Sequence, residues 1–384
     1  MKPATMLKAT EKPLMKTLSG LAAASLGAAL LAACGGYGIS SSTPLSIAAL
    51  RAAVGRAPRR AVGPNLYVAN VGHTVTVYAA ASGTVLRTIS QDLDFPGALA
   101  FDHSGNLYVS DFGFDNVKVY AAGGTSLLET ISQGVCDPSA LAFDSAEDLY
   151  VGNVCPPSRG GSSVTVYAPG STSVLRTITQ GIDYPEDLAF DSSGNLYVAN
   201  IGPYRGQSTI SVYAPGKKEV LRTISQGIEK PIQVVFDSSG TLHVVNCFNC
   251  AYGGTVTLYA PGSKKVLRTI SQGVHQPRAV AFDDAGNLFV ANYYSPKSHS
   301  GKGCTVTAYA PASSSVMETI SNGIHNPGAL AFDGSGNLYV ANENGACGGN
   351  SRYGTITVYA PGSTSAFLTI SQGISGPLAL AFGP

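Results

Sequence analysis

The sequence predicts an all-β protein that folds as a seven-bladed β-propeller over residues 64–384. A short motif of the Asn-Leu-Tyr-Val type recurs about every 41 to 50 residues, a period typical of propellers and solenoids. The seven copies begin at Asn65, Asn106, Asp148, Asn195, Thr241, Asn287 and Asn337. Each copy contains four short apolar runs separated by turn residues, as the four strands of a propeller blade would require.

The fourth copy shows how the expected strands are delimited. They lie at residues 187–190, 195–199, 209–214 and 220–225. The segment from Asp191 to Gly194 predicts a hairpin turn between the first two, because Asp bonds to the following backbone and Gly tolerates positive φ. Pro215 ends the third strand, since proline has no N–H to donate to a ladder.

The polarity of the four runs predicts their order from the centre of the ring outwards. The first run, of the Ala-Leu-Ala-Phe type, is almost entirely apolar and is expected to be innermost, buried on both faces. The fourth run carries a charge at one recurring position, which suits an edge strand because charge discourages pairing with other molecules. These charges are Arg87, Glu129, Arg176, Arg222, Arg268 and Glu318.

The two ends of the repeat region predict how the ring closes. The first copy begins at its second strand, at Asn65, and the chain finishes on an isolated first strand from Pro377 to Phe382. Joined in one sheet, the C-terminal strand completes the first blade. An open solenoid would instead need atypical capping repeats at both ends.

The chain resembles the NHL-repeat propellers and their gluconolactonase-like relatives in one recurring pattern. It reads Pro-x-Ala-Leu-Ala-Phe-Asp-x-x-Gly-Asn-Leu-Tyr-Val-Ala-Asn and is followed by a Val-x-Val-Tyr strand. The resemblance covers roughly residues 64–384 and implies a propeller more than any one function, because this fold hosts scaffolds, ligand binders and enzymes.

Residues 1–33 predict a lipoprotein signal peptide. A lysine-rich leader precedes an Ala/Leu-rich run that ends in Leu31-Ala-Ala-Cys34, which resembles a bacterial lipobox and would make Cys34 the lipidated residue. An ordinary signal peptide or an uncleaved membrane anchor is the alternative. Residues 34–63, rich in Gly, Ser, Ala and Pro, predict a flexible tether. We therefore expect an exported cell-envelope lipoprotein, held in the outer membrane if the cell is Gram-negative.

The charge composition of the chain bears on which partners it can bind. Charged residues make up 12% of the chain and the net charge is +1, which argues against nucleic acid binding. We expect a monomer that meets the membrane through its lipid anchor only.

Six cysteines besides Cys34 favour disulfides, since an even number in an exported protein indicates pairing. Propeller topology suggests Cys136 with Cys155 inside one blade, and Cys304 and Cys347 lie in loops of neighbouring blades. Cys247 and Cys250 share one loop as a Cys-x-x-Cys motif. A redox motif, or a zinc site built from the last four, is the alternative.

The loops between the second and third strands vary most in length, and binding usually resides in such loops. They carry the Tyr and Arg side chains that are common at recognition hot spots. The predicted binding surface comprises Tyr204, Arg205, Phe248, Tyr252, Tyr293, Tyr294, His299, Arg352 and Tyr353.

A metal site is the second hypothesis. Two residues before the recurring proline of the first strand, four consecutive copies carry a carboxylate or imidazole, a set that suits a divalent ion. The predicted ligands are Asp183, Glu229, His275 and His325. A solvated turn would also favour polar residues here. The recurring Asn or Asp that ends each second strand looks like a ring of ligands, but its seven-fold repetition favours a structural role.

We therefore expect a binding module rather than an enzyme, with no cofactor, that contacts a protein or an envelope polymer through its loops. The alternatives are a metal-dependent hydrolase or lyase of the lactonase kind and a carbohydrate-binding protein.

Overall fold

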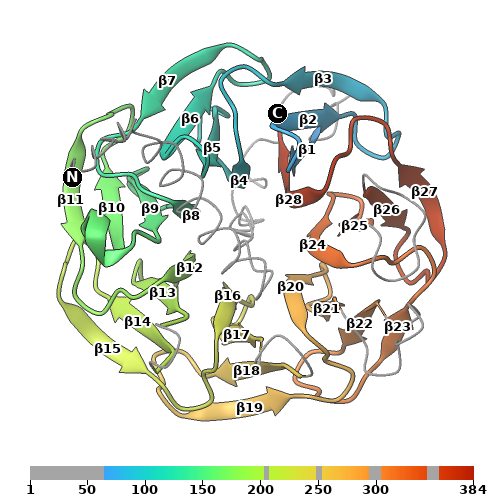
Figure 1. Ribbon diagram of the computed structural model, residues 1–384. Coiled ribbons are helices and arrows are strands. Elements are labelled where there is room, and N and C mark those ends of the chain that lie inside the picture. The colour runs from blue at the N-terminus through green and yellow to red at the C-terminus, as the bar shows by residue number, and fades with distance from the viewer. Residues whose placement is uncertain (1–64, 203–206, 248–252, 294–303, 344–353) are drawn as a thin grey trace, which may run out of the picture.

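The computed structural model describes residues 65–202, 207–247, 253–293, 304–343 and 354–384, which form seven four-stranded antiparallel sheets arranged as a ring (Figure 1). We number these sheets as blades 1 to 7. No helix in these ranges is long and apolar enough to cross a membrane.

The strands follow the repeat copies closely. Blade 1 contains β28 (Pro377–Gly383), β1 (Asn65–Asn70), β2 (Thr74–Tyr78) and β3 (Val85–Ile89). Blade 2 contains β4 (Pro96–Phe101), β5 (Leu107–Asp111), β6 (Asn116–Tyr120) and β7 (Leu127–Ile131). Blade 3 contains β8 (Pro138–Phe143), β9 (Leu149–Asn153), η2 (Pro157–Arg159), β10 (Ser163–Tyr167) and β11 (Val174–Ile178). Blade 4 contains β12 (Pro185–Phe190), β13 (Leu196–Asn200), β14 (Thr209–Tyr213) and β15 (Val220–Ile224). Blade 5 contains β16 (Pro231–Phe236), β17 (Leu242–Asn246), β18 (Thr255–Tyr259) and β19 (Val266–Ile270). Blade 6 contains β20 (Pro277–Phe282), β21 (Leu288–Asn292), β22 (Thr305–Tyr309) and β23 (Glu318–Ile320). Blade 7 contains β24 (Pro327–Phe332), β25 (Leu338–Asn342), β26 (Thr355–Tyr359) and β27 (Ala366–Ile370).

The predicted closure of the ring is confirmed. β28 pairs antiparallel with β1, from Asn65 opposite Gly383 to Ala69 opposite Ala379. It therefore takes the innermost place in blade 1, which a continuous first strand takes in every other blade (Figure 1).

The blades have two distinct ends, which give the ring two faces. At one end, the connection into the first strand lies beside the loop between the second and third strands, as the hydrogen bond from Ile201 N to Tyr184 O shows at 3.1 Å. We call this end the loop face. At the other end lie the turns between the first and second strands and between the third and fourth. We call this end the turn face.

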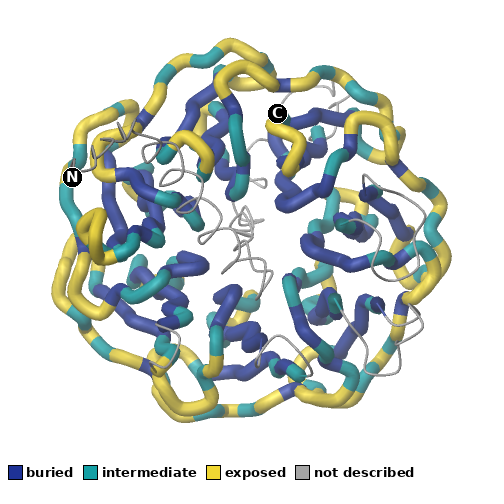
Figure 2. Tube along the Cα trace, in the orientation of Figure 1, coloured by how far each residue is buried: buried dark blue, intermediate teal, exposed yellow. Residues whose placement is uncertain are grey.

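The core lies between neighbouring blades. Among the described residues there are seven hydrophobic clusters, and each is built from two adjacent blades, so that every sheet is buried on both faces. Buried residues gather in the inner strands, and exposed residues lie mainly along the outer rim of the ring (Figure 2). One T-shaped ring pair crosses each interface, joining the second strand of one blade to the Phe of the next inner strand. His243 takes the place of the usual aromatic residue in blade 5, 5.0 Å from the ring of Phe282. The last pair, Tyr339 with Phe382, depends on the C-terminal strand.

The outer strands differ from expectation in which residue is exposed. The recurring arginine does not project from the edge; in blade 1, Arg87 lies over the Tyr67 ring at 5.5 Å and donates a 2.5 Å hydrogen bond to its hydroxyl. Arg176 and Arg222 lie over Tyr150 and Tyr197 in the same way. The side chain exposed at the rim is instead the preceding apolar residue. The seven residues of this apolar rim are Leu86, Leu128, Leu175, Leu221, Leu267, Met317 and Phe367.

Candidate functional site

A ring of buried Asn and Asp side chains holds the loop face in shape. Each residue ends a second strand and is almost fully buried. Its side-chain oxygen accepts a hydrogen bond from a backbone N–H that lies two residues before the proline at the start of the first strand. In blade 4, Asn200 Oδ1 accepts from Asp183 N at 3.0 Å, and its Nδ2 donates to Ser211 Oγ at 3.2 Å. The seven residues are Asn70, Asp111, Asn153, Asn200, Asn246, Asn292 and Asn342. The structural role predicted for this ring is confirmed.

The four predicted metal ligands occupy the same position in four consecutive blades. The Asn ring fixes the backbone N–H of Asp183, Glu229, His275 and His325, one in each of blades 4 to 7. Burial raises the pKa of Asp183 and lowers the pKa of His275. Within the described residues, however, none of the four belongs to a group of three or more side chains with ligand atoms within 4.8 Å of one another. The structure holds them in register but does not bring them together.

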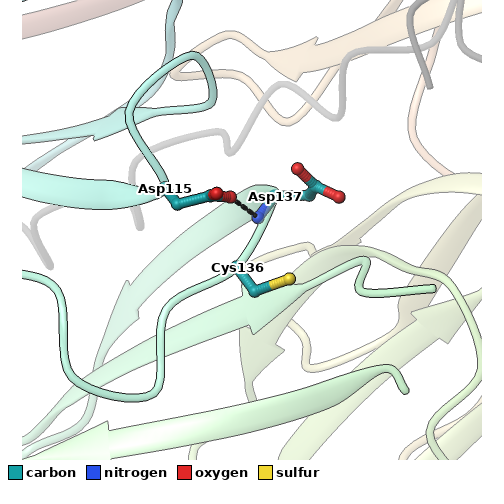
Figure 3. Close-up of side chains that lie close together, drawn as sticks. All are labelled: Asp115, Cys136 and Asp137. Carbon is teal, nitrogen blue, oxygen red and sulfur yellow. Dashed lines mark hydrogen bonds between the residues drawn. The ribbon is translucent and has the colours of Figure 1, made fainter. Parts of the chain in front are cut away.

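The group that does come together lies between blades 2 and 3. In the described part of the chain, Asp115, Cys136 and Asp137 place their ligand atoms within 4.8 Å of one another (Figure 3). Asp115 Oδ1 accepts a 2.7 Å hydrogen bond from Asp137 N, and Asp115 Oδ2 lies 2.6 Å from Arg159 Nη2. Arg159 Nη1 also lies 3.5 Å from Asp137 Oδ1, so one guanidinium faces two carboxyl groups.

The charges in this cluster are not balanced. Burial raises the pKa of Asp137 to about 6; the Asp115 carboxylate adds to the rise and Arg159 opposes it. A hydrogen bond to Asp115 raises the pKa of Arg159. Sequence patterns did not single out this cluster, because Asp115 and Arg159 lie in loops of different length that the repeat does not align.

The donor set of this cluster fits a metal ion poorly. Cys136 is disulfide-bonded to Cys155, and a disulfide sulfur cannot supply the thiolate that a metal prefers. Arg159 already neutralises part of the carboxylate charge. The arrangement is therefore better described as an ion-pair cluster that fastens the second–third loop of blade 3 to blade 2.

The disulfide between Cys136 and Cys155 confirms the pairing predicted within one blade, with the two Cα atoms 5.6 Å apart. Cys247 and Cys304 are both buried. The partners considered for them, Cys250 and Cys347, lie outside the described residues, so these pairings stay predictions.

A second polar group lies between blades 6 and 7 on the loop face. Arg278 is the bulged residue of β20, and a bulge redirects a side chain out of the normal strand alternation. Its guanidinium carbon lies 4.3 Å from the centre of the Tyr293 ring. Arg278 Nε and Nη1 are shielded from solvent and make no hydrogen bond within the described residues.

Glu343, from the end of β25, faces this arginine across the blade interface. Burial raises the pKa of Glu343, and the charge of Arg278 opposes the rise. The glycine at position 328 leaves room for the carboxyl group, since a Cβ there would lie 2.5 Å from Glu343 Oε1. Burial also raises the pKa of Tyr293; Glu343 adds to the rise and Arg278 opposes it. The three residues form a compact amphipathic group.

Polar side chains on the inner strands link adjacent blades. Asp187 Oδ2 in β12 accepts from Val234 N in β16 at 3.0 Å, and Gln233 Oε1 accepts from Val280 N in β20 at 2.7 Å. Burial raises the pKa of Asp187 to about 8, opposed by hydrogen bonds from backbone N–H groups. These links explain why polar residues occur in otherwise apolar strands.

Of the predicted binding surface, Tyr293 is described and packs on Arg278. Tyr204, Arg205, Phe248, Tyr252, Tyr294, His299, Arg352 and Tyr353 lie outside the described residues, as do Cys34 and the whole of residues 1–64.

A pocket of about 270 Å³ lies on the turn face between blades 6 and 7. Asp283, Asp284 and Glu318 give it an acidic rim, and Phe289, Phe332 and Tyr359 line its apolar part.

Comparisons with known proteins support the fold alone. No family model matches the chain, and no curated protein matches it in sequence. The resemblance to NHL-repeat propellers is therefore not confirmed as family membership. Among solved structures, the chain is similar to the hydrazine synthase of Kuenenia stuttgartiensis, with a TM-score of 0.60 and 18% identity. The match covers 75% of this chain and 90% of that one. At this identity the likeness shows a shared propeller architecture.

Proposed function

We propose that the protein is an exported, lipid-anchored propeller that binds a protein or an envelope polymer through its loop face. The proposal rests on the polar side-chain clusters of the loop face, which differ from blade to blade. The strands, the Asn ring and the interface stacks repeat around the molecule. Among the described residues, the clusters Asp115–Asp137–Arg159 and Arg278–Tyr293–Glu343 occur once each, both on the loop face. A rigid scaffold with singular polar groups at one end suits recognition.

The Arg278–Tyr293–Glu343 group has the chemistry of a recognition hot spot. Tyr and Arg are enriched at the centres of interfaces, where a stacked arginine presents N–H donors at small entropic cost. A partner that supplies a carboxylate or another acceptor would complete the hydrogen bonding of Arg278, which has free N–H groups among the described residues.

Binding to cell-envelope extract and to a glycan array tests the proposal, with the purified protein immobilised. We expect specific capture that is lost in the double variant Arg278→Met/Tyr293→Leu. The matched control is Thr172→Ala/Thr364→Ala, which alters two exposed turn-face positions. Equal capture by both variants, each shown to melt like the natural protein, would contradict the loop-face assignment.

Lipid anchoring is tested separately, through Cys34→Ser. We expect the natural protein to partition into the detergent phase of a Triton X-114 extraction and the variant to fail to do so after processing. Identical partition of the two would rule out lipidation at Cys34.

A further inference from the structure

The turns between the third and fourth strands break the seven-fold pattern in one place. All seven turns lie within the described residues, and five of them carry no ionisable side chain: 79–84, 121–126, 168–173, 310–315 and 360–365. The other two, in the neighbouring blades 4 and 5, carry Lys217, Lys218 and Glu219, and Lys264 and Lys265. Both lysine pairs are exposed, and both lie on the turn face. We call this sector the basic edge.

The basic edge combines charge with exposed apolar area. The apolar rim residue of each outer strand follows the turn by a few residues, and here it is Leu221, 54% exposed, and Leu267, 58% exposed. These are the most exposed of the large apolar residues in the described chain. Lysine beside protruding leucine is the composition of a surface that lies at a lipid interface, with cations among the headgroups and apolar groups below them.

The basic edge is a shaped surface, because both turns are held by hydrogen bonds. Lys217 N donates to Ala214 O at 3.0 Å, and Lys265 N donates to Ser263 Oγ at 2.9 Å. The four ammonium groups therefore start from fixed backbone positions. The acidic pocket of Asp283, Asp284 and Glu318 begins in the next blade, so charge limits the cationic sector to blades 4 and 5.

The described chain begins on the same face. β1 begins at Asn65, opposite Gly383, which is the end of blade 1 where other blades have their turn between first and second strands. Asn65, the first described residue, therefore lies on the turn face, the face that carries the lysines.

We propose that the basic edge docks on an anionic phospholipid surface, with the four lysines at the headgroups and Leu221 and Leu267 at the interface. The loop face then points away from the bilayer. This contact is independent of lipidation, because all of its residues belong to the propeller itself. It adds a second membrane contact to a single anchor, an arrangement that stabilises membrane attachment.

The test uses the propeller of residues 65–384, whose ring is closed within that range by β28 and β1. Co-sedimentation is measured with vesicles rich in phosphatidylglycerol and with vesicles of pure phosphatidylcholine. We expect salt-sensitive binding to the anionic vesicles only, and a loss of about fivefold in affinity for each lysine removed.

The variants can be built from the protein's own turns. Lys217→Ser/Lys218→Thr/Glu219→Ser and Lys264→Thr/Lys265→Ser convert both turns to the Ser-Thr-Ser sequence of blades 3 and 7, so folding should be unaffected. Leu221→Ser/Leu267→Ser tests the apolar part, with Leu86→Ser/Leu128→Ser in blades 1 and 2 as its matched control. We expect the turn variant to lose binding, the first leucine variant to bind more weakly, and the control to bind normally.

Three results would overturn the proposal. One is an absence of binding by the natural propeller, and another is unchanged binding by the turn variant. The third is that the propeller binds soluble heparin as tightly as it binds the anionic vesicles, while Leu221→Ser/Leu267→Ser has no effect on vesicle binding. This result would identify a general polyanion site instead. None of these results bears on capture by the loop face, so this inference and the proposed function fail separately.

Discussion

At the scale of single residues, the propeller depends on buried polar side chains whose donors and acceptors are hydrogen-bonded. Asn200 is 1% exposed and uses both ends of its amide, which connects the loop face to the third strand. A buried polar group is stabilising only while its partners are present, and removing one partner leaves the others unpaired.

The substitution Asn200→Ala should therefore destabilise the protein by about 2 kcal/mol, because the Asp183 N–H loses its acceptor and the Ser211 hydroxyl oxygen loses a donor. Urea unfolding measures the change. Asn195→Ala is the matched control: this half-buried turn residue has water within reach, so its loss should cost less. Equal costs for the two would contradict the importance of the buried ring.

The carboxyl of Asp137 makes stability depend on pH. Its pKa in the folded protein is raised to about 6, above its ordinary value of 3.8, so the folded state binds the proton more tightly than the unfolded state. Stability from this group is present at low pH and is lost as the pH rises from about 4 through about 6. We expect Asp137→Asn to raise the melting temperature at pH 7.5 and to leave it nearly unchanged at pH 4.

The control for this prediction is Asp115→Asn. Asp115 holds both Arg159 and the Asp137 N–H, so its neutralisation should lower the melting temperature at pH 7.5. A stabilising effect of both substitutions would show that the cluster is only repulsive.

At the scale of strands and blades, one tyrosine hydroxyl fastens each blade to the preceding one. The hydroxyls of Tyr167, Tyr213 and Tyr259, at the ends of third strands, donate to Gln carbonyls of the neighbouring blade at 2.6, 2.5 and 2.5 Å. These tyrosines are almost fully buried, so water is poorly placed to replace a lost bond; the Tyr167 hydroxyl also lies 3.1 Å from Thr165 Oγ1.

The triple variant Tyr167→Phe/Tyr213→Phe/Tyr259→Phe should lose about 3 kcal/mol, about 1 for each bond, since well-separated sites contribute additively. Chemical unfolding of the single and triple variants checks both the size and the additivity. Tyr108→Phe is the control, because the Tyr108 hydroxyl makes no hydrogen bond within the described residues although its ring is buried. A triple variant as stable as the control would mean that these bonds contribute nothing.

The repeat made the blades predictable from sequence, because each strand is specified seven times and one exceptional copy does not hide the pattern. Closure by β28 and the pairing of Cys136 with Cys155 followed from the same alignment. The contact between Arg87 and Tyr67 could not be predicted from this alignment, because the two residues lie two strands apart in the blade and the sequence shows only that a charge recurs. Clusters such as Asp115 with Arg159 were also missed, since singular loop residues meet only through the fold.

At the scale of the whole molecule, stability depends on the last eight residues. β28 contributes Leu378, Ala379, Leu380 and Ala381 to the buried core, and Phe382 to the stack with Tyr339. The apolar burial in this strand contributes on the order of 5 to 10 kcal/mol, comparable to the net stability of a domain.

A chain ending at Gly376 should therefore not unfold as one cooperative unit, and its unpaired β1 edge should promote association. Calorimetry and light scattering would detect both effects. Removal of residues 1–64, which leaves all of the described strands in place, is the control and should keep the melting transition. A sharp, monomeric transition in the chain ending at Gly376 would contradict the requirement for closure.

The pairing of β1 with β28 also sets an order of events in time. Residues 65 and 383 are partners across almost the whole length of the ring, whereas the strands of blades 2 to 7 find their partners within one repeat. Short-range pairs form early and long-range pairs late, because closing a long loop costs more entropy. During synthesis, β1 emerges before the other described strands and its inner partner emerges last. Blade 1 therefore waits unfinished, with one edge open, until the six other blades have been made.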